Sequence, residues 1–395
     1  MVKIWVGRTQ MTVKPKERLL SLDAFRGLTI ASMIMVNNPG SWSHLFRPLG
    51  HADWHGWTPT DWIFPFFLFI MGTAMAFSFG KKMSAGAKPK DFLGKIFSRS
   101  LIIFIIGLAL NLNIRILRVV FHETIDNGLG EAIHAVFSQL RILGVLQRIA
   151  ICYFVASLII IYGKKSTRYL WVFLLFLVYT LILAFVRVPG EAAYELARGR
   201  NIIFYIDHLV LGNHMWTPAN EPEGIVSTLP AIVCVLFGFF TGEWVRSEAS
   251  KPAKLAGLIG GGLFLMMQGL LLDDFMPINK PLWTVSYTLF TSGLAMQYLG
   301  LCYFFIDMQG IKKWATPFLA FGSNAIVVFA GSSYVAATLA LAQIGDTSIK
   351  NILYQNLFLS WLSDYNASFF YSFTYMVLWG IVAFILYRKK IFIRV

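Results

Sequence analysis

A histidine in the first polar stretch of the chain, His51, has the side chain best suited to chemistry. Asn37 and Asn38 precede it, and Thr58 and Asp61 follow it in an arrangement typical of a helix start. An imidazole titrates near neutral pH, so it can take a proton from an attacking amine or hydroxyl or carry an acyl group. The amide of Asn37 can donate an N–H to a developing oxyanion. The alternative is that His51 is an ordinary loop histidine bonded to a neighbour.

The same stretch also offers possible metal ligands, namely His51, Asp53 and His55. Histidines four residues apart can share a metal when they lie on a helix. Gly56 and Pro59 indicate a loop instead, and no ligand beyond these is obvious in the sequence. We therefore expect no metal.

Charged and amide side chains interrupt two of the apolar segments. Asp23 and Arg26 are three residues apart and therefore share a helix face. They form either an ion pair within the helix or an anion site in which the arginine grips a phosphate. Arg141, Gln147 and Arg148 fall in another apolar segment, where charge is costly and marks a candidate functional site. Arg141 can equally be an interface anchor.

Other polar and aromatic residues stand at the ends of apolar segments. Glu223 precedes one segment, where an acid favours the positive end of a helix, and Trp283 precedes another, where tryptophan commonly anchors the interface. Asn324 lies within a segment, where it either joins two helices or lines a site. Besides the catalytic candidates His51 and Asn37, we predict that acyl-CoA or substrate binds Asp23, Arg26, Asn38, Asp61, Arg141, Gln147, Arg148, Glu223, Asn279, Trp283 and Asn324.

The elements that must position these residues are membrane helices. The chain has 395 residues, of which 57% are hydrophobic and only 14% charged, and apolar stretches long enough to span a bilayer recur along it. Backbone groups in lipid must be satisfied within the segment, which favours helices. We predict an all-α integral membrane protein with about ten spans, the ninth broken or kinked: 22–40, 61–80, 99–118, 140–162, 169–187, 225–245, 254–272, 283–306, 316–342 and 367–387.

The distribution of charge predicts the orientation. With ten alternating spans, most Lys and Arg residues fall in segments on the same side as both termini, which predicts that both termini are cytoplasmic. The net charge of +14 follows from this topology, so no nucleic-acid partner is expected. The three cysteines all lie in predicted spans, which argues against a disulfide framework. We expect a tail over residues 1–17 and a single transmembrane domain over residues 18–395.

Several motifs resemble one family, the heparan-α-glucosaminide N-acetyltransferases and their bacterial relatives. They occur in order along the chain, and the longest and most specific contains His51. The motifs are Arg18–Gly27, Val36–Gly40, His51–Gly72, Leu140–Arg148, Pro222–Gly224, Asn279–Trp283 and Gly322–Ile326.

The resemblance implies that an acetyl group passes from cytoplasmic acetyl-CoA to the amine of a glucosamine on the far side of the membrane. His51 and Asn37 match the active-site residues of the family, and Asp23 and Arg26 match an aspartate and an arginine that the family has in the first span. In this resemblance, His55 stands at a position where the animal enzyme has an asparagine, so contacts with the sugar are expected to differ. The large lumenal domain of the animal enzyme has no counterpart here, which favours a bacterial inner-membrane protein over a lysosomal one.

The residues alone leave other functions open. An amino-sugar transporter without chemistry also needs many spans with polar residues near helix breaks. An O-acyltransferase acting on a cell-surface glycan needs the same catalytic groups. Lipid surrounds the chain in each case, and the exposed aromatic faces fit either lipid or a partner subunit, which makes a homodimer possible.

Overall fold

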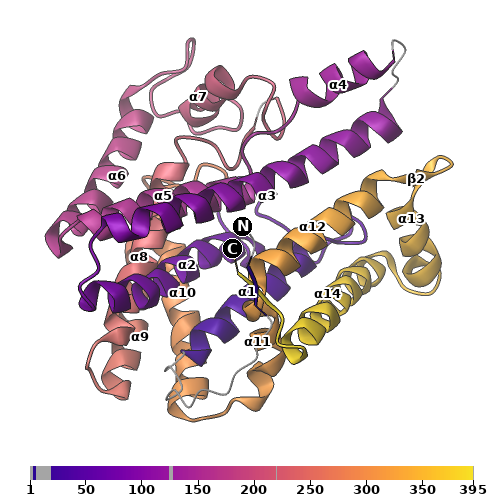
Figure 1. Ribbon diagram of the computed structural model, residues 1–395. Coiled ribbons are helices and arrows are strands. Elements are labelled where there is room, and N and C mark those ends of the chain that lie inside the picture. Colours follow the sequence, from indigo (N-terminus) through magenta and orange to yellow (C-terminus); the bar gives the residue numbers. More distant parts are fainter. Residues whose placement is uncertain (1–2, 6–18, 124–127, 219, 395) are drawn as a thin grey trace.

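The computed structural model describes residues 3–5, 19–123, 128–218 and 220–394. Fourteen α-helices account for most of these residues (Figure 1). They are α1 (Leu20–Val36), α2 (Pro59–Ser84), α3 (Lys90–His122), α4 (Leu129–Ser138), α5 (Val145–Tyr162), α6 (Lys165–Phe185), α7 (Ile202–Leu211), α8 (Thr228–Arg246), α9 (Lys251–Leu271), α10 (Val285–Cys302), α11 (Thr316–Ser323), α12 (Ala325–Leu341), α13 (Ile349–Tyr354) and α14 (Asp364–Arg388).

Short irregular helices and strands complete the described chain. Single 3₁₀ turns cover Arg47–Leu49 and Lys313–Ala315, and π-helical turns continue α10 over Tyr303–Met308 and α13 over Gln355–Leu359. The strands are β1 (Lys3–Trp5), β2 (Gln343–Ile344), β3 (Thr347–Ser348) and β4 (Phe392–Arg394), paired antiparallel as β1 with β4 and β2 with β3. The chain is therefore nearly all helical, and the strands are the one departure from the all-α prediction within the described residues.

Eight of the described helices are long and apolar enough to cross a membrane, namely α2, α3, α5, α6, α8, α9, α10 with its π-helical turn, and α14. The pair α11 and α12 makes a ninth span if it is counted as one, with a bend of 72°. The bend falls at Asn324, between the two helices, which confirms the predicted break in the ninth span. α1 is also apolar but has only 17 residues. The count of ten spans, like the orientation of the termini, stays a prediction.

Several helices begin or end away from the predicted bounds, and the largest difference is at α3, which begins at Lys90 rather than at residue 99. α1 ends at Val36 rather than at residue 40, because residues before a proline, here Pro39, avoid the helical conformation. α5 begins at Val145 rather than at residue 140. The backbone N–H of Ile142 instead donates to the carbonyl of His214 over 3.1 Å, which holds the preceding residues in a loop.

Of the eight described helices of spanning length, four lie at the centre of the bundle and four lie around it, and α1 is also buried along most of its length. In the apolar windows of α2, α5 and α8, 67–72% of the residues are buried, and in α10 56%, against 17–22% in α3, α6, α9 and α14. α2 packs along α8 through glycines, since a methyl group on Gly72 would lie 1.9 Å from the Val235 carbonyl oxygen and one on Gly238 would lie 2.0 Å from that of Phe69. Small residues of this kind let membrane helices approach closely.

The connections between helices gather at the two ends of the bundle. The α1–α2, α6–α7 and α9–α10 connections are hydrogen-bonded to one another at one end, through Gly56 and Ile278 and through Trp54 and Leu196. The α7–α8 connection is bonded to the α4–α5 connection at the same end, for example through His214 and Ile142. At the other end β1 pairs with β4, so the two chain ends lie side by side (Figure 1). Apart from β1, the predicted tail over residues 1–17 lies outside the described residues.

Candidate active site

His51 is held by a buried carboxylate at the start of α2. Its Nδ1 atom lies 2.6 Å from Oδ1 of Asp61. The other carboxylate oxygen, Oδ2, accepts the backbone N–H groups of Ala52 and Thr58, each over 3.0 Å. The side chain of Asp61 is 2% exposed, whereas that of His51 is 46% exposed. A fixed, buried acceptor therefore orients an imidazole that solvent can reach.

This pairing determines which nitrogen of His51 is available for chemistry. A carboxylate accepts hydrogen bonds and does not donate them, so the Nδ1 atom carries the hydrogen. Nε2 then keeps its lone pair in the neutral imidazole. A base or nucleophile oriented by a third group is the arrangement used in acyl transfer. The side chains of His51 and Asp61 are therefore arranged for this chemistry.

The α9–α10 connection is bound to the loop that contains His51. The backbone N–H of Gly56 donates to the carbonyl of Ile278 over 2.7 Å. The side-chain amide of Asn279 donates to the carbonyl of Trp54 over 2.9 Å and accepts the backbone N–H of Leu282 over 2.8 Å. Asn279, a predicted site residue, is therefore buried and joins two connections that are far apart in sequence.

Lys280 comes next in the same connection, and sequence reasoning missed it. Its Nζ atom lies 3.1 Å from Nδ1 and 3.4 Å from Nε2 of His51, and 3.6 Å from Oδ1 of Asp61. A signal was present in the sequence, because a lysine on the predicted outer side departs from the excess of basic residues on the cytoplasmic side.

A buried ion cluster lies at the same end of the bundle, between the α4–α5 and α7–α8 connections. Arg141 donates from Nε to Glu221 over 2.9 Å and from Nη2 to Glu223 over 2.6 Å, with a second bond from Nη2 to Glu221. Its guanidinium stacks 4.9 Å from the ring centre of Trp216. Burial raises the pKa of Glu221, and Arg141 opposes this effect. Arg141 is thus the counterion of two carboxylates rather than an interface anchor.

We expect Arg141→Ala to lower the free energy of unfolding by about 3–5 kcal/mol, because two buried carboxylates would lose their partner. The measurement is the melting temperature of the purified protein in detergent. The matched control is Arg200→Ala. Arg200 is bonded to Glu191, and the Arg200 side chain is 59% exposed. The melting temperature of Arg200→Ala should stay unchanged, since exposed ion pairs contribute little. Equal losses in both variants would contradict a structural role for this cluster.

Arg148 is buried in the first turn of α5, next to Gln147. Its Nη2 atom donates to the carbonyl of Gly224 over 3.0 Å and to the hydroxyl of Ser227, and its guanidinium stacks 4.9 Å from the ring centre of Trp283. Among the described residues, the Nε and Nη1 atoms of Arg148 and the Nε2 atom of Gln147 have no hydrogen-bond partner. Trp283 adopts a positive φ of 54°.

The Pro-Glu-Gly motif has a packing explanation at its glycine. A methyl group on Gly224 would lie 1.8 Å from Oδ2 of Asp207 in α7. The other oxygen of Asp207 accepts the backbone N–H of Ile225 over 2.7 Å. Burial raises the pKa of Asp207 to about 6. Only a glycine leaves room for this carboxyl group beneath the connection that contains Glu223.

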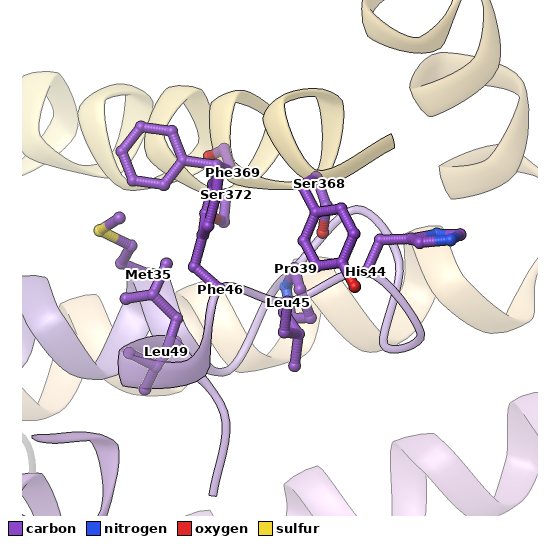
Figure 2. A pocket seen from close by; sticks show the side chains of 11 residues that line it. Met35, Pro39, His44, Leu45, Phe46, Leu49, Ser368, Phe369 and Ser372 are labelled. Atoms are coloured by element: carbon purple, nitrogen blue, oxygen red, sulfur yellow. Dashed lines mark hydrogen bonds between the residues drawn. The ribbon is translucent and has the colours of Figure 1, made fainter. Parts of the chain in front are cut away.

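The predicted asparagines after α1 do not contact His51 through any hydrogen bond among the described residues. Asn37 is exposed, and the Asn38 amide donates to the carbonyl of Ile34 over 2.6 Å. The loop that follows is attached to α14, where the hydroxyl of Ser368 accepts a backbone N–H over 3.0 Å. Figure 2 shows Phe46 of this loop beside Phe369 of α14. The role of Asn37 at the oxyanion stays a prediction.

The remaining predicted residues lie at the opposite end of the bundle. Asp23 and Arg26 form an ion pair of 3.2 Å within α1, which is one of the two alternatives that their spacing left open. The side chain of Asn324 donates to the carbonyl of Ile391 and accepts the backbone N–H of Ile393, each over 2.9 Å. Asn324 therefore fastens the C-terminal strand to the break between α11 and α12.

A cavity of about 320 Å³ opens beside these residues. Two arginines, Arg26 of α1 and Arg99 of α3, share it with the hydroxyls of Ser78 and Ser323. The rest of the lining is almost entirely apolar: Phe67, Ile70, Met71, Ala74, Met75, Ile103, Ile149, Gly322, Ala325, Ile326, Phe392 and Ile393. The cavity thus combines two arginine side chains with an apolar lining.

The possible metal ligands of the first loop are not gathered into a cluster. Within the described parts of the chain, no group of three or more His, Cys, Asp or Glu side chains is arranged to hold a metal ion. His51 is paired with Asp61 instead. This finding does not test the expectation that the site holds no metal.

A bundle of membrane-type helices with an oriented, accessible histidine at one end defines a multispan membrane protein whose site is suited to group transfer. The chain belongs to the family described as heparan-alpha-glucosaminide N-acetyltransferase, catalytic, whose sequence profile matches residues 18–270. This confirms the family predicted from the motifs.

Two mammalian proteins named heparan-alpha-glucosaminide N-acetyltransferase are similar to the chain. It is 26% identical to the Mus musculus protein and 27% identical to the Homo sapiens protein, and each alignment covers 96% of this chain. The chain spans about 60% of the length of these relatives.

Proposed function

We propose that this protein is a transmembrane N-acetyltransferase, which moves an acetyl group from acetyl-CoA to the amine of a glucosamine-type sugar on the opposite side of the membrane. The observation that carries the proposal is the accessible imidazole of His51 oriented by the buried carboxylate of Asp61. Membership of an acetyltransferase family supports the acyl group as the group transferred. No step requires a metal.

His51 acts in one of two ways that need the same residues. As a general base, its Nε2 atom takes the proton of the amine while the amine attacks the thioester carbonyl. As a nucleophile, Nε2 itself receives the acetyl group and passes it to the amine. In both routes Asp61 fixes the imidazole and stabilises its positively charged form.

The donor binds at the other end of the bundle, in the cavity that Arg26 and Arg99 line. Guanidinium groups pair with phosphate oxygens in a planar fork, and coenzyme A carries phosphates at one end and an apolar arm towards the thioester. The basic segments predict that this end faces the cytoplasm, with both termini, and that the His51 end faces the periplasm of a bacterial inner membrane. A homodimer is compatible with this arrangement.

We expect Arg99→Ala to raise KM for acetyl-CoA by about 10-fold or more, because a hydrogen bond to a charged group would be lost. The turnover number should change little, since Arg99 is far from the reacting atoms in this proposal. Steady-state kinetics with varied acetyl-CoA measure both constants. Arg118→Ala, an exposed arginine near the other end of α3, is the matched control. An unchanged KM in Arg99→Ala would remove this cavity as the phosphate site.

The acceptor approaches the exposed face of His51. His55 is also exposed there, and its Nδ1 atom lies 3.3 Å from the side-chain amide of Asn279. Burial lowers the pKa of His55, with Asp273 opposing the effect, so this ring is favoured in its neutral form. A neutral imidazole in this position can bond to sugar hydroxyls or to a free amine.

The test is acetyl transfer from radiolabelled acetyl-CoA by the purified protein to a panel of acceptors. The proposal predicts N-acetylation of glucosamine and not of glucose. Transfer to hydroxyl acceptors alone would make the protein an O-acyltransferase. Uptake of amino sugar into proteoliposomes in the absence of acetyl-CoA would make it a transporter.

A further inference from the structure

Lys280 is held in place by the elements on either side of the site. The residue before it, Asn279, is fully buried and bonds to the carbonyl of Trp54 over 2.9 Å. The backbone N–H of Trp283 returns to the carbonyl of Lys280 over 3.0 Å. The Lys280 side chain is only 21% exposed. The position of its ammonium group beside His51 is therefore set by the fold and not by a flexible surface chain.

Charged groups surround this ammonium from the elements packed against it. Asp61 of α2 lies 3.6 Å away, and the imidazole of His51 lies 3.1 Å away. Glu223, from the α7–α8 connection, also acts on it electrostatically. Burial lowers the pKa of Lys280, while Asp61 and Glu223 oppose this and favour the charged form. The cluster therefore contains a cation next to the reacting nitrogen of His51.

We propose that Lys280 is a further catalytic group, whose ammonium stabilises the oxyanion formed when the acetyl thioester is attacked at His51. The inference rests on the proposed function and extends it. Nζ lies 3.4 Å from Nε2, so an acetyl carbonyl that reaches this nitrogen is also next to the ammonium. A positive donor fixed where negative charge develops lowers the barrier of such a reaction.

The step balances without any further reactant. The amine nitrogen forms a bond to the carbonyl carbon, the carbonyl electron pair moves to oxygen, and Nε2 of His51 takes the amine proton. Collapse of the oxyanion breaks the carbon–sulfur bond, and the departing thiolate takes that proton from His51. Lys280 stays protonated throughout, and its charge compensates the oxyanion while it exists.

The test compares Lys280→Met and Lys280→Arg with the wild-type protein. Lys280→Met keeps the length of the side chain and removes the charge, and we expect kcat to fall by about 100-fold with little change in KM for acetyl-CoA. Lys280→Arg should be at least about 10-fold more active than Lys280→Met, because it restores the charge. The control is Lys350→Met. Lys350 is a partly buried lysine of α13 whose ammonium lies over the ring of Tyr371.

The pH profile separates a charge effect from a structural one. A lysine whose pKa is lowered by burial loses its proton below the pH expected of an ordinary lysine, so wild-type kcat should fall on the alkaline side. In Lys280→Arg this fall should move to higher pH, because a guanidinium stays charged. If Lys280→Met does not fold, as judged by its melting temperature, this comparison decides.

The outcomes distinguish the two claims. If the wild-type protein transfers acetyl groups, any of three results would overturn the role of Lys280 and leave the proposed function standing. These are an unchanged kcat in Lys280→Met, a Lys280→Arg variant no more active than Lys280→Met, and the same alkaline fall in kcat for the wild type and Lys280→Arg. A wild-type protein that transfers no acetyl group overturns both.

Discussion

His51→Ala should lower kcat for acetyl transfer by about 10²–10⁴-fold, the range that a positioned acid–base group contributes. KM for acetyl-CoA should stay within about twofold, since the imidazole acts on the reacting atoms and not on the distant phosphates. The Nδ1 atom is 2.6 Å from Asp61, and the imidazole is exposed to incoming substrate. Steady-state kinetics on the purified protein in detergent measure both constants.

A second histidine of the same loop provides the matched control. His44 also lies near a carboxylate, with Nε2 3.5 Å from Oδ2 of Asp364, but that carboxylate is 57% exposed. His44→Ala should keep kcat within about twofold of the wild-type value, because an exposed pair of this kind contributes little. Equal losses in His44→Ala and His51→Ala would mean that the loop, and not His51, is what the enzyme requires.

Asp61→Asn should lower kcat by a similar factor, about 10²–10⁴-fold, although the reacting atoms are untouched. The carboxylate accepts hydrogen bonds from His51, Ala52 and Thr58. An amide in its place presents an NH₂ group as well as an oxygen. With its NH₂ group towards His51, it would leave Nδ1 as the acceptor and put the hydrogen on Nε2, where no lone pair would then remain for catalysis.

A loss of kcat without a loss of affinity for acetyl-CoA identifies this mechanism. Asp61→Asn should retain its affinity for acetyl-CoA, and Asp61→Glu should be more active than Asp61→Asn because it keeps a carboxylate at this position. Asp53→Asn, an exposed residue two positions from His51, is the control and should behave as the wild type. If Asp61→Asn kept the wild-type kcat, the proposal that Asp61 orients the catalytic imidazole would be wrong.

The helices were predictable because helix formation in lipid is a local property. Each apolar stretch must satisfy its own backbone, and every predicted span contains a helix in the structure. The break at Asn324 was predictable for the same reason, from polar and small residues within an apolar run. The true start of α5 was not, because the residues before it are held by a hydrogen bond between Ile142 and His214, which are far apart in sequence.

Contacts within the candidate site could be predicted only between residues that are close in sequence. His51 and Asp61 belong to one loop and the helix that follows it, so their pairing could be suspected from the chain itself. The contact of Lys280 with His51 joins positions 229 residues apart, and that of Arg141 with Glu221 joins positions 80 apart. Such pairs depend on how the helices pack, and hydropathy contains no information about that packing.

The central claim is that an acetyl group crosses from a donor on one side of the membrane to an acceptor on the other through His51. The direct measurement uses proteoliposomes with radiolabelled acetyl-CoA sealed inside and glucosamine outside. We predict labelled N-acetylglucosamine outside the vesicles with the wild-type protein and only background label with His51→Ala. Label transfer that is equal in the two proteins, or glucosamine uptake with no acetylation, would contradict it.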